Sequence, residues 1–231
     1  MKNILIPLLA IIIIVSCTRD KKGSMLVTGD VKGLKKGTLY LQKTNDSIVV
    51  AVDSIVLDGV STFSLSDDIE SPEIYYLALN NDLEKKILFF GDIGTIDIQT
   101  KLDKFSFGAT ITGLKNQQLL ENYNDMIKDF RDRNLELIEA EFEVRKSNDS
   151  LKIDSVQNLF QRLVKSRYRY TINYAITNAD AEVAPYLALT ELYNANIVWL
   201  DSVNNSLSNK VKSSKYGKRL DKFISEIKSK E

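Results

Sequence analysis

The feature that most constrains the fold of this chain is a change of sequence pattern near Gly113. Before that glycine, short alternating or β-branched segments are separated by Gly, Asn and Asp, a pattern typical of strands and turns. After it, glycine becomes rare and apolar residues recur at spacings of three and four, as in amphipathic helices. The sequence therefore predicts an α+β fold, in which a small antiparallel β-sandwich or barrel is followed by an antiparallel helical segment.

Short strands are expected between residues 25 and 113. The segments are Met25–Val31, Thr38–Leu41, Ser47–Leu57, Thr62–Leu65, Ile74–Leu79, Lys86–Phe90, Thr95–Ile98 and Phe105–Ile111. The last segment alternates cleanly, which predicts that Phe105, Phe107, Ala109 and Ile111 share one face of a strand.

Helices are expected over residues 114–231. They cover about 116–146 and 151–178, and further helices begin near Glu182, Ile197 and Tyr216. The first two are joined by the short turn Ser147-Asn148-Asp149-Ser150, which can also cap the second helix, so we expect an antiparallel hairpin. The boundary near Gly113 thus separates a β-rich domain (25–113) from a helical segment (114–231).

The amino terminus has the pattern of an export signal. A lysine at position 2 precedes an apolar run from Ile4 to Val15, which is too short to span a bilayer, since a spanning helix needs roughly 20 residues. Residues 1–16 are therefore predicted to be a signal peptide. The sequence Ile14-Val15-Ser16-Cys17 resembles the bacterial lipobox. That resemblance implies that Cys17 receives a diacylglyceryl group and, after cleavage, an acyl chain on its new amino terminus.

The same motif predicts where the protein resides. Two or more acyl chains hold a protein on a membrane essentially permanently. Residues 17–24 are polar and are expected to form a tether between lipid and fold. Thr18 follows Cys17 without the aspartate that favours inner-membrane retention, so we expect the periplasmic face of the outer membrane. The alternative is an ordinary signal or membrane anchor with an incidental cysteine.

Composition excludes several classes of function. Lys plus Arg and Asp plus Glu both number 31, so no basic excess favours nucleic acid. Histidine is absent and the single cysteine is assigned to lipid, which excludes the common zinc ligand sets, Ser-His-Asp triads, Cys-His dyads and thiol–disulfide exchange. We expect no metal, no cofactor and no enzymatic activity.

Aromatic and basic side chains concentrate in the helical half. The candidate partner contacts are Tyr168, Tyr170, Tyr174, Tyr186, Tyr193 and Trp199, because such rings are enriched at recognition surfaces. Packing of the same rings at the rim of a core is the alternative. A basic run near the carboxyl end is interpreted as a solvated helix face rather than a contact with anionic lipid or a partner: Lys210, Lys212, Lys215, Lys218, Arg219 and Lys222.

Several segments together resemble a known family. They are Gly33–Leu41, the Asp58-Gly59 turn before Phe63, Tyr75–Leu77, Phe90–Ile96, Ala184–Leu189 and Ser214–Leu220. They are similar to the domain-of-unknown-function family DUF4369, the usual N-terminal module of thioredoxin-like lipoproteins in Bacteroidetes. In that family the redox chemistry belongs to a C-terminal thioredoxin fold with a Cys-x-x-Cys motif, which this sequence lacks. The resemblance therefore carries over no catalytic residue.

These observations lead to one leading hypothesis and two alternatives. The leading hypothesis is a membrane-anchored, non-catalytic binding or scaffolding module of the cell envelope. One alternative, implied by the resemblance, is an accessory to thioredoxin-like proteins supplied by a separate chain. The other is a carboxylate-based hydrolase, for example one that acts on glycans, which would need two acids in one cleft, about 5 to 5.5 Å apart for retention or about 6.5 to 9.5 Å apart for inversion.

Overall fold

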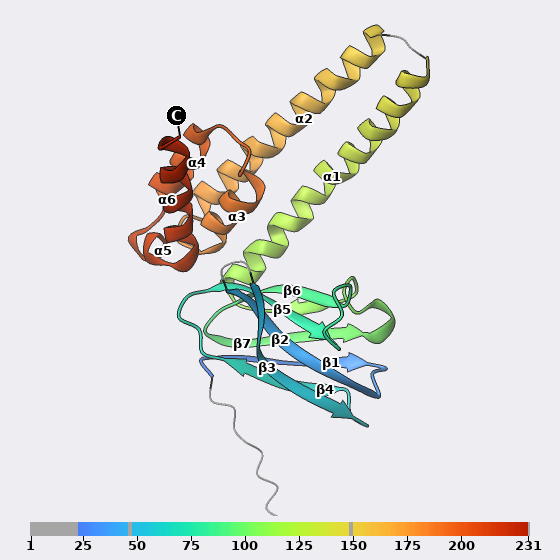
Figure 1. The fold of residues 1–231 in the computed structure, drawn as a ribbon, viewed down its shortest axis with the longest axis vertical. Coiled ribbons are helices and arrows are strands. Elements are labelled where there is room, and N and C mark those ends of the chain that lie inside the picture. The colour runs from blue at the N-terminus through green and yellow to red at the C-terminus, as the bar shows by residue number, and fades with distance from the viewer. Residues whose placement is uncertain (1–22, 46–47, 148–149, 231) are drawn as a thin grey trace, which may run out of the picture.

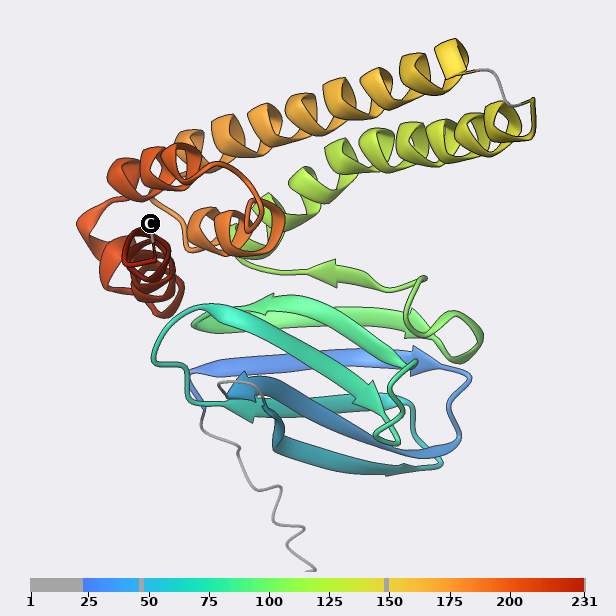
Figure 2. The same ribbon diagram turned by 45° about the horizontal axis from the view of Figure 1, so that its top comes forward.

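A computed structural model of the chain describes residues 23–45, 48–147 and 150–230, and Figure 1 shows its arrangement. A β-sandwich forms one part, and helices stand on one side of it (Figures 1 and 2). The predicted signal peptide, the lipidation site Cys17 and most of the predicted tether lie outside the described residues. Among the residues described, no helix combines the length and the apolar character needed to cross a bilayer.

The strands follow the predicted pattern closely. They are β1 (Met25–Lys32), β2 (Lys36–Asn45), β3 (Ile48–Asp58), β4 (Thr62–Asp67), β5 (Glu73–Leu79), β6 (Lys86–Gly91), β7 (Gly94–Lys101) and β8 (Thr110–Thr112). They form two four-stranded sheets, ordered β4-β1-β7-β8 and β3-β2-β5-β6. All pairs are antiparallel except β1 with β7, which run parallel from Met25 opposite Gly94 to Lys32 opposite Lys101.

The two sheets enclose one apolar core. Alternate residues of each strand point inward, as the period of two requires, and fully buried examples are Val27, Leu41, Leu65, Leu77, Phe89, Ile96 and Ile98. Burial of each such side chain stabilises the fold by roughly 1.5 to 3 kcal/mol. The prediction of a small, mostly antiparallel sandwich is confirmed, and the described strands do not close into a barrel.

The prediction of a regular strand from Phe105 to Ile111 is wrong. Leu102–Lys104 form a 3₁₀ helix, η1, Phe105 has helical dihedral angles, and only the end of the segment belongs to β8. The Gly108 N–H donates a 2.8 Å hydrogen bond to the Lys104 carbonyl, which closes a turn. Phe105 is consequently buried whereas Phe107 is 99% exposed. A local backbone hydrogen bond thus prevails over the alternating pattern, because β-propensity depends strongly on context.

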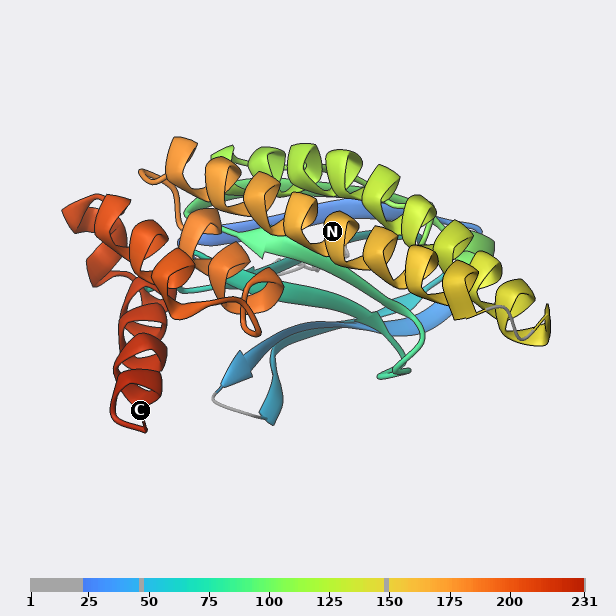
Figure 3. The same cartoon turned by 90° about the horizontal axis from the view of Figure 1, so that it is seen from above.

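The helices also begin and end close to the predicted positions. They are α1 (Lys115–Ser147), α2 (Ser150–Thr177), α3 (Val183–Glu191), α4 (Ile197–Ser206), α5 (Asn209–Ser213) and α6 (Lys215–Lys228). Helix α5 was not predicted. The helices α1 and α2 form the expected antiparallel hairpin, about 50 Å long at 1.5 Å per residue (Figures 1 and 3). The expected cap at residues 147–150 falls largely outside the described residues.

Helices α3 to α6 pack beside the base of the hairpin, as Figure 1 shows. Their shared core contains Ile172 and Ala175 of α2 together with Ala188, Leu200, Val203, Leu220 and Ile224. A separate cluster joins the helices to the sheet: Ile74 and Phe90 contribute from β5 and β6, and Leu120, Tyr123, Val183, Leu187 and Tyr216 from the helices. The helical segment is therefore packed on the outer face of the β3-β2-β5-β6 sheet.

Candidate binding groove

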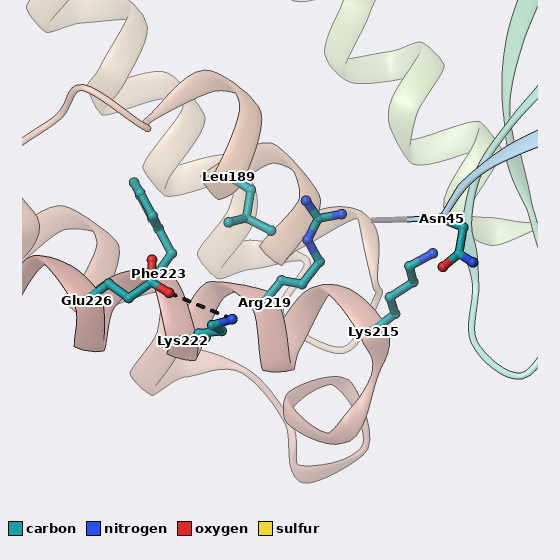
Figure 4. A pocket seen from close by; sticks show the side chains of 7 residues that line it. All are labelled: Asn45, Leu189, Lys215, Arg219, Lys222, Phe223 and Glu226. Carbon is teal, nitrogen blue, oxygen red and sulfur yellow. Dashed lines mark ion pairs between the residues drawn. The ribbon is translucent and has the colours of Figure 1, made fainter. Parts of the chain in front are cut away.

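An open groove lies where the sheet meets the helices. It consists of two adjoining cavities of about 400 and 280 Å³ that share Leu189, Lys215 and Arg219. Figure 4 shows the side chains that line the first of them. Strands β2 and β5 supply Thr44, Asn45, Glu73, Ile74 and Tyr76; α3 supplies Tyr186 and Thr190; α6 supplies Tyr216, Lys222, Phe223 and Glu226. The groove therefore depends on elements that are far apart in the sequence.

Helix α6 provides most of the charged side chains of the groove. Lys215, Arg219 and Lys222 recur at helical spacings, so they occupy one side of the helix. Leu220 and Ile224 are buried in the helical core on another side. The helix begins in register because the Ser214 hydroxyl accepts a 3.2 Å hydrogen bond from the Gly217 N–H, an N-cap that satisfies an otherwise unpaired donor.

The cations of the groove differ in their partners. Lys215 pairs with the Glu73 carboxylate and donates a 3.1 Å hydrogen bond to the Thr44 carbonyl. Lys222 lies 3.8 Å from the Glu226 carboxylate. Within residues 23–45, 48–147 and 150–230, the guanidinium of Arg219 has no carboxylate partner and no hydrogen bond. Figure 4 shows Lys215 and Arg219 extending from α6 toward Asn45 and Leu189. Arg219 is thus the groove cation that has no partner among the described residues.

Aromatic rings form the inner wall. The Tyr186 and Tyr216 rings lie 5.3 Å apart, and both contact Phe90 edge-on. Burial raises the pKa of Tyr186 to about 12, and burial also raises the pKa of Tyr216. Both phenols are therefore neutral at ordinary pH. The wall is apolar with hydroxyl groups, and it adds no negative charge beside Arg219.

A buried polar cluster lies at the same joint between sheet and helices. The Asn116 side chain accepts a 3.0 Å hydrogen bond from the Val183 N–H and donates to carboxylate oxygens of Glu182 (2.9 Å) and Asp92 (3.1 Å). Lys210 lies 3.4 Å from the other oxygen of Glu182, whose side chain is 3% exposed. These polar groups are hydrogen-bonded or ion-paired with one another. We therefore interpret the cluster as a structural contact that holds α1 against the start of α3, and not as a ligand-binding site.

The six predicted partner contacts are distributed over several places. In the joint, Tyr170 stacks with Tyr123 and the Tyr174 ring packs against Tyr123 at a tilt, and burial raises the pKa values of Tyr170 and Tyr174. Tyr186 lines the groove. Tyr168 and Trp199 meet at a small hollow of about 190 Å³ with Lys165 and Arg169. Tyr193 lies just beyond the end of α3 and is 58% exposed. The set does not form one surface, and a partner contact at these residues stays a prediction.

The described part of the chain offers few side-chain groups for metal binding or for catalysis by a pair of carboxylates. No group of three or more His, Cys, Asp or Glu residues converges there as a metal site would require. In the groove, Glu73 and Glu226 each pair with a lysine. Glu73 has the closer partner, Lys215, and Glu226 lies 3.8 Å from Lys222 on the exposed side of α6.

Comparison with known proteins identifies one family. Residues 25–120 match the model of a family described as a domain of unknown function, DUF4369. The predicted family resemblance is thereby confirmed over the sandwich and the first turns of α1. The association with thioredoxin-like lipoproteins stays a prediction. No curated protein and no solved structure matches the chain.

Sequence reasoning did not identify the groove. Lys215, Arg219 and Lys222 were within the basic run, but that run was interpreted as a solvated helix face. The available signal was the helical spacing of three cations beside the apolar Phe223. This spacing indicates a groove only together with the tertiary structure, which places Leu189 and Asn45 opposite α6.

Proposed function

We propose that this protein is a lipoprotein anchored through Cys17 in the outer membrane, facing the periplasm, where it acts as a non-catalytic binding module. The observation that supports binding is the groove at the joint, which combines partly exposed apolar side chains with the guanidinium of Arg219, unpaired among the described residues. Ligand sites in proteins are usually concave surfaces in which a few placed polar groups lie beside apolar side chains. The groove is formed by the sandwich and the helices together, which gives the whole fold a role in binding.

The character of the lining residues favours binding over reaction. The phenols of Tyr186 and Tyr216 are kept protonated by burial, and the Glu73 carboxylate is paired with Lys215. A general base has to be free to accept a proton and within reach of the group that loses it. These groups are instead arranged to hold charge and shape, as a binding site requires.

Attachment to the membrane is tested by the substitution Cys17→Ser. Cells supplied with labelled palmitate should give a labelled wild-type protein in the outer-membrane fraction, because the cysteine sulfur is the predicted acceptor. The variant should carry no label and leave that fraction. A wild-type protein without label, or a variant that retains it, would contradict the anchoring part of the proposal.

Binding at the groove is tested separately in intact cells. A photo-crosslinking amino acid at Thr190, which is exposed on the rim, should give a defined adduct. The same amino acid at Phe107, which is exposed on a turn of the sandwich, is the matched control and should not. Mass spectrometry of the adduct shows whether the partner is thioredoxin-like, as the family resemblance implies. Equal labelling at both positions would contradict binding at the groove.

A further inference from the structure

We propose that the groove receives an oxyanion, a carboxylate or a phosphate, carried on an apolar body, and that Arg219 is its anchor. This inference rests on the proposed binding function and specifies its ligand. Two independent features support it: the charge balance among the groove residues, and the apolar surface next to the unpaired cation.

Among the residues that the structure describes, the charge balance of the groove leaves one cation, Arg219, without a carboxylate partner. Three cations, Lys215, Arg219 and Lys222, line the groove with two carboxylates, Glu73 and Glu226. The lysines are each paired with one of these carboxylates. Arg219 is left to interact with a ligand. A guanidinium presents a planar fork of N–H donors that matches the two oxygens of a carboxylate or phosphate, which makes arginine well suited to such groups.

The backbone from which Arg219 extends is held in place by the fold. One helical turn before it, the Lys215 N–H donates a 3.0 Å hydrogen bond to the Ser71 hydroxyl, and the Lys215 ammonium contacts Glu73. These contacts attach the start of α6 to the segment leading into β5. The guanidinium therefore projects from a helix that is held at a fixed distance from the sheet, which favours a selective contact over a diffuse surface charge.

Apolar surface lies next to the cation. Leu189 of α3 and Phe223 of α6 both line the groove, and both are only partly buried. A free inorganic anion would leave this surface in contact with water. A ligand with an apolar group beside its oxyanion would cover it, at a gain of roughly 25 cal/mol per Å² buried. The combination therefore selects an amphipathic anion.

The test uses three small probes that share an aromatic ring. N-acetyl-phenylalanine carries a carboxylate, phenyl phosphate carries a phosphate, and N-acetyl-phenylalanine amide is neutral. Isothermal titration calorimetry with the full chain in detergent should show saturable binding of at least one anionic probe and markedly weaker binding of the amide. The two anionic probes distinguish a carboxylate ligand from a phosphate ligand. Affinity should fall as salt is added, because exposed charges are screened.

Variants of α6 locate the binding. Arg219→Gln should weaken the anionic probe about tenfold or more, since a hydrogen bond to a charged group is worth that much in affinity. Arg219→Lys keeps the charge but loses the fork, so we expect an intermediate loss. Lys218→Gln is the matched control, because Lys218 is exposed on the same helix and does not line the groove. It should bind the probe as the wild type does.

Three results would overturn the proposal: absence of saturable binding of both anionic probes, equal affinity for the amide, or equal losses in Arg219→Gln and Lys218→Gln. Crosslinking at Thr190 separates this failure from that of the binding function. If adducts form at Thr190 while both anionic probes fail, the ligand class is wrong and the binding function stands. If adducts also fail to form, the binding function is wrong as well.

Discussion

The backbone N–H of Ile74 in β5 donates a 3.0 Å hydrogen bond to the hydroxyl oxygen of Tyr216 in α6, 142 residues further along the chain. Both residues are buried at the joint between sheet and helices. Because Tyr216 opens the helix that carries Arg219, this bond sets the wall of the groove relative to the sandwich. The same hydrogen bond therefore holds the sandwich and the helices together and positions the helix that lines the groove.

Removal of the Tyr216 hydroxyl should destabilise the protein. In Tyr216→Phe the ring remains, but the buried Ile74 N–H loses its acceptor, which costs about 1 to 3 kcal/mol of unfolding free energy. Urea unfolding followed by circular dichroism measures the change. Tyr193→Phe is the control, because that side chain is 58% exposed, and it should stay within about 0.5 kcal/mol of the wild type. Equal stability of the two variants would show that the bond contributes nothing.

The Asn116 side chain should stabilise the contact between α1 and α3 about as strongly as the Tyr216 hydroxyl stabilises the contact between α6 and the sheet. Asn116→Ala leaves the Val183 N–H without its acceptor and the buried Glu182 carboxylate without one of its donors, so we expect a loss of about 2 kcal/mol or more. Hydrogen exchange of the Val183 amide should accelerate at the same time. The exposed Asn194→Ala is the control. Unchanged exchange at Val183 would rule out this role for Asn116.

Replacing Gly217 in α6 by alanine should lower the stability of the protein, although helix propensity alone predicts an increase. Alanine is favoured over glycine inside a helix by about 1 kcal/mol. Here, however, a Cβ atom would lie 2.0 Å from the Val211 carbonyl oxygen, a backbone atom with little freedom to move. We expect Gly217→Ala to destabilise by about 1 to 3 kcal/mol. Ser225→Ala, exposed on the same helix, should be nearly neutral in thermal unfolding. A higher melting temperature for Gly217→Ala would disprove the close contact.

Stability should decline in alkali. Burial raises the pKa of six tyrosines: Tyr75, Tyr123, Tyr170, Tyr174, Tyr186 and Tyr216. An unfolded chain releases these protons near pH 10 while the folded chain retains them. The unfolded state therefore binds fewer protons, and the free energy of unfolding falls as pH rises above about 10.

Urea midpoints measured at about pH 8, 10 and 11 test this dependence. The share of the phenolate absorbance that comes from these six rings should appear only with unfolding, because their hydroxyls become accessible to solvent then. A constant midpoint across this range would contradict the burial of these rings.

Much of the architecture could be predicted because it is encoded by local periodicity. The period-two segments became strands, and the three- and four-residue spacing after Gly113 became helices. The prediction of a strand over Phe105–Ile111 is wrong because its alternating pattern is also compatible with a turn. The hydrogen bond from the Gly108 N–H to the Lys104 carbonyl stabilises the turn. Helix α5 is only five residues long, which is too short for a periodic signal.

The candidate site could not be predicted in the same way. Its cations were visible as a helical series, but their partners depend on long-range contacts such as Lys215 with Glu73. Whether a tyrosine packs or is exposed depends equally on tertiary structure: Tyr170 stacks on Tyr123, and Tyr193 faces solvent. No spacing within the chain distinguishes these two environments.

The position of β1 bears on how the protein withstands mechanical load. Met25 opens a strand that lies between β4 and β7, in register with both over most of its length. Tension on the chain ahead of Met25 pulls along this strand, so the hydrogen bonds of two ladders resist in parallel and have to break together. A terminal strand at the sheet's margin would peel away bond by bond. The sandwich is therefore constructed to remain folded when it is pulled by its amino-terminal end.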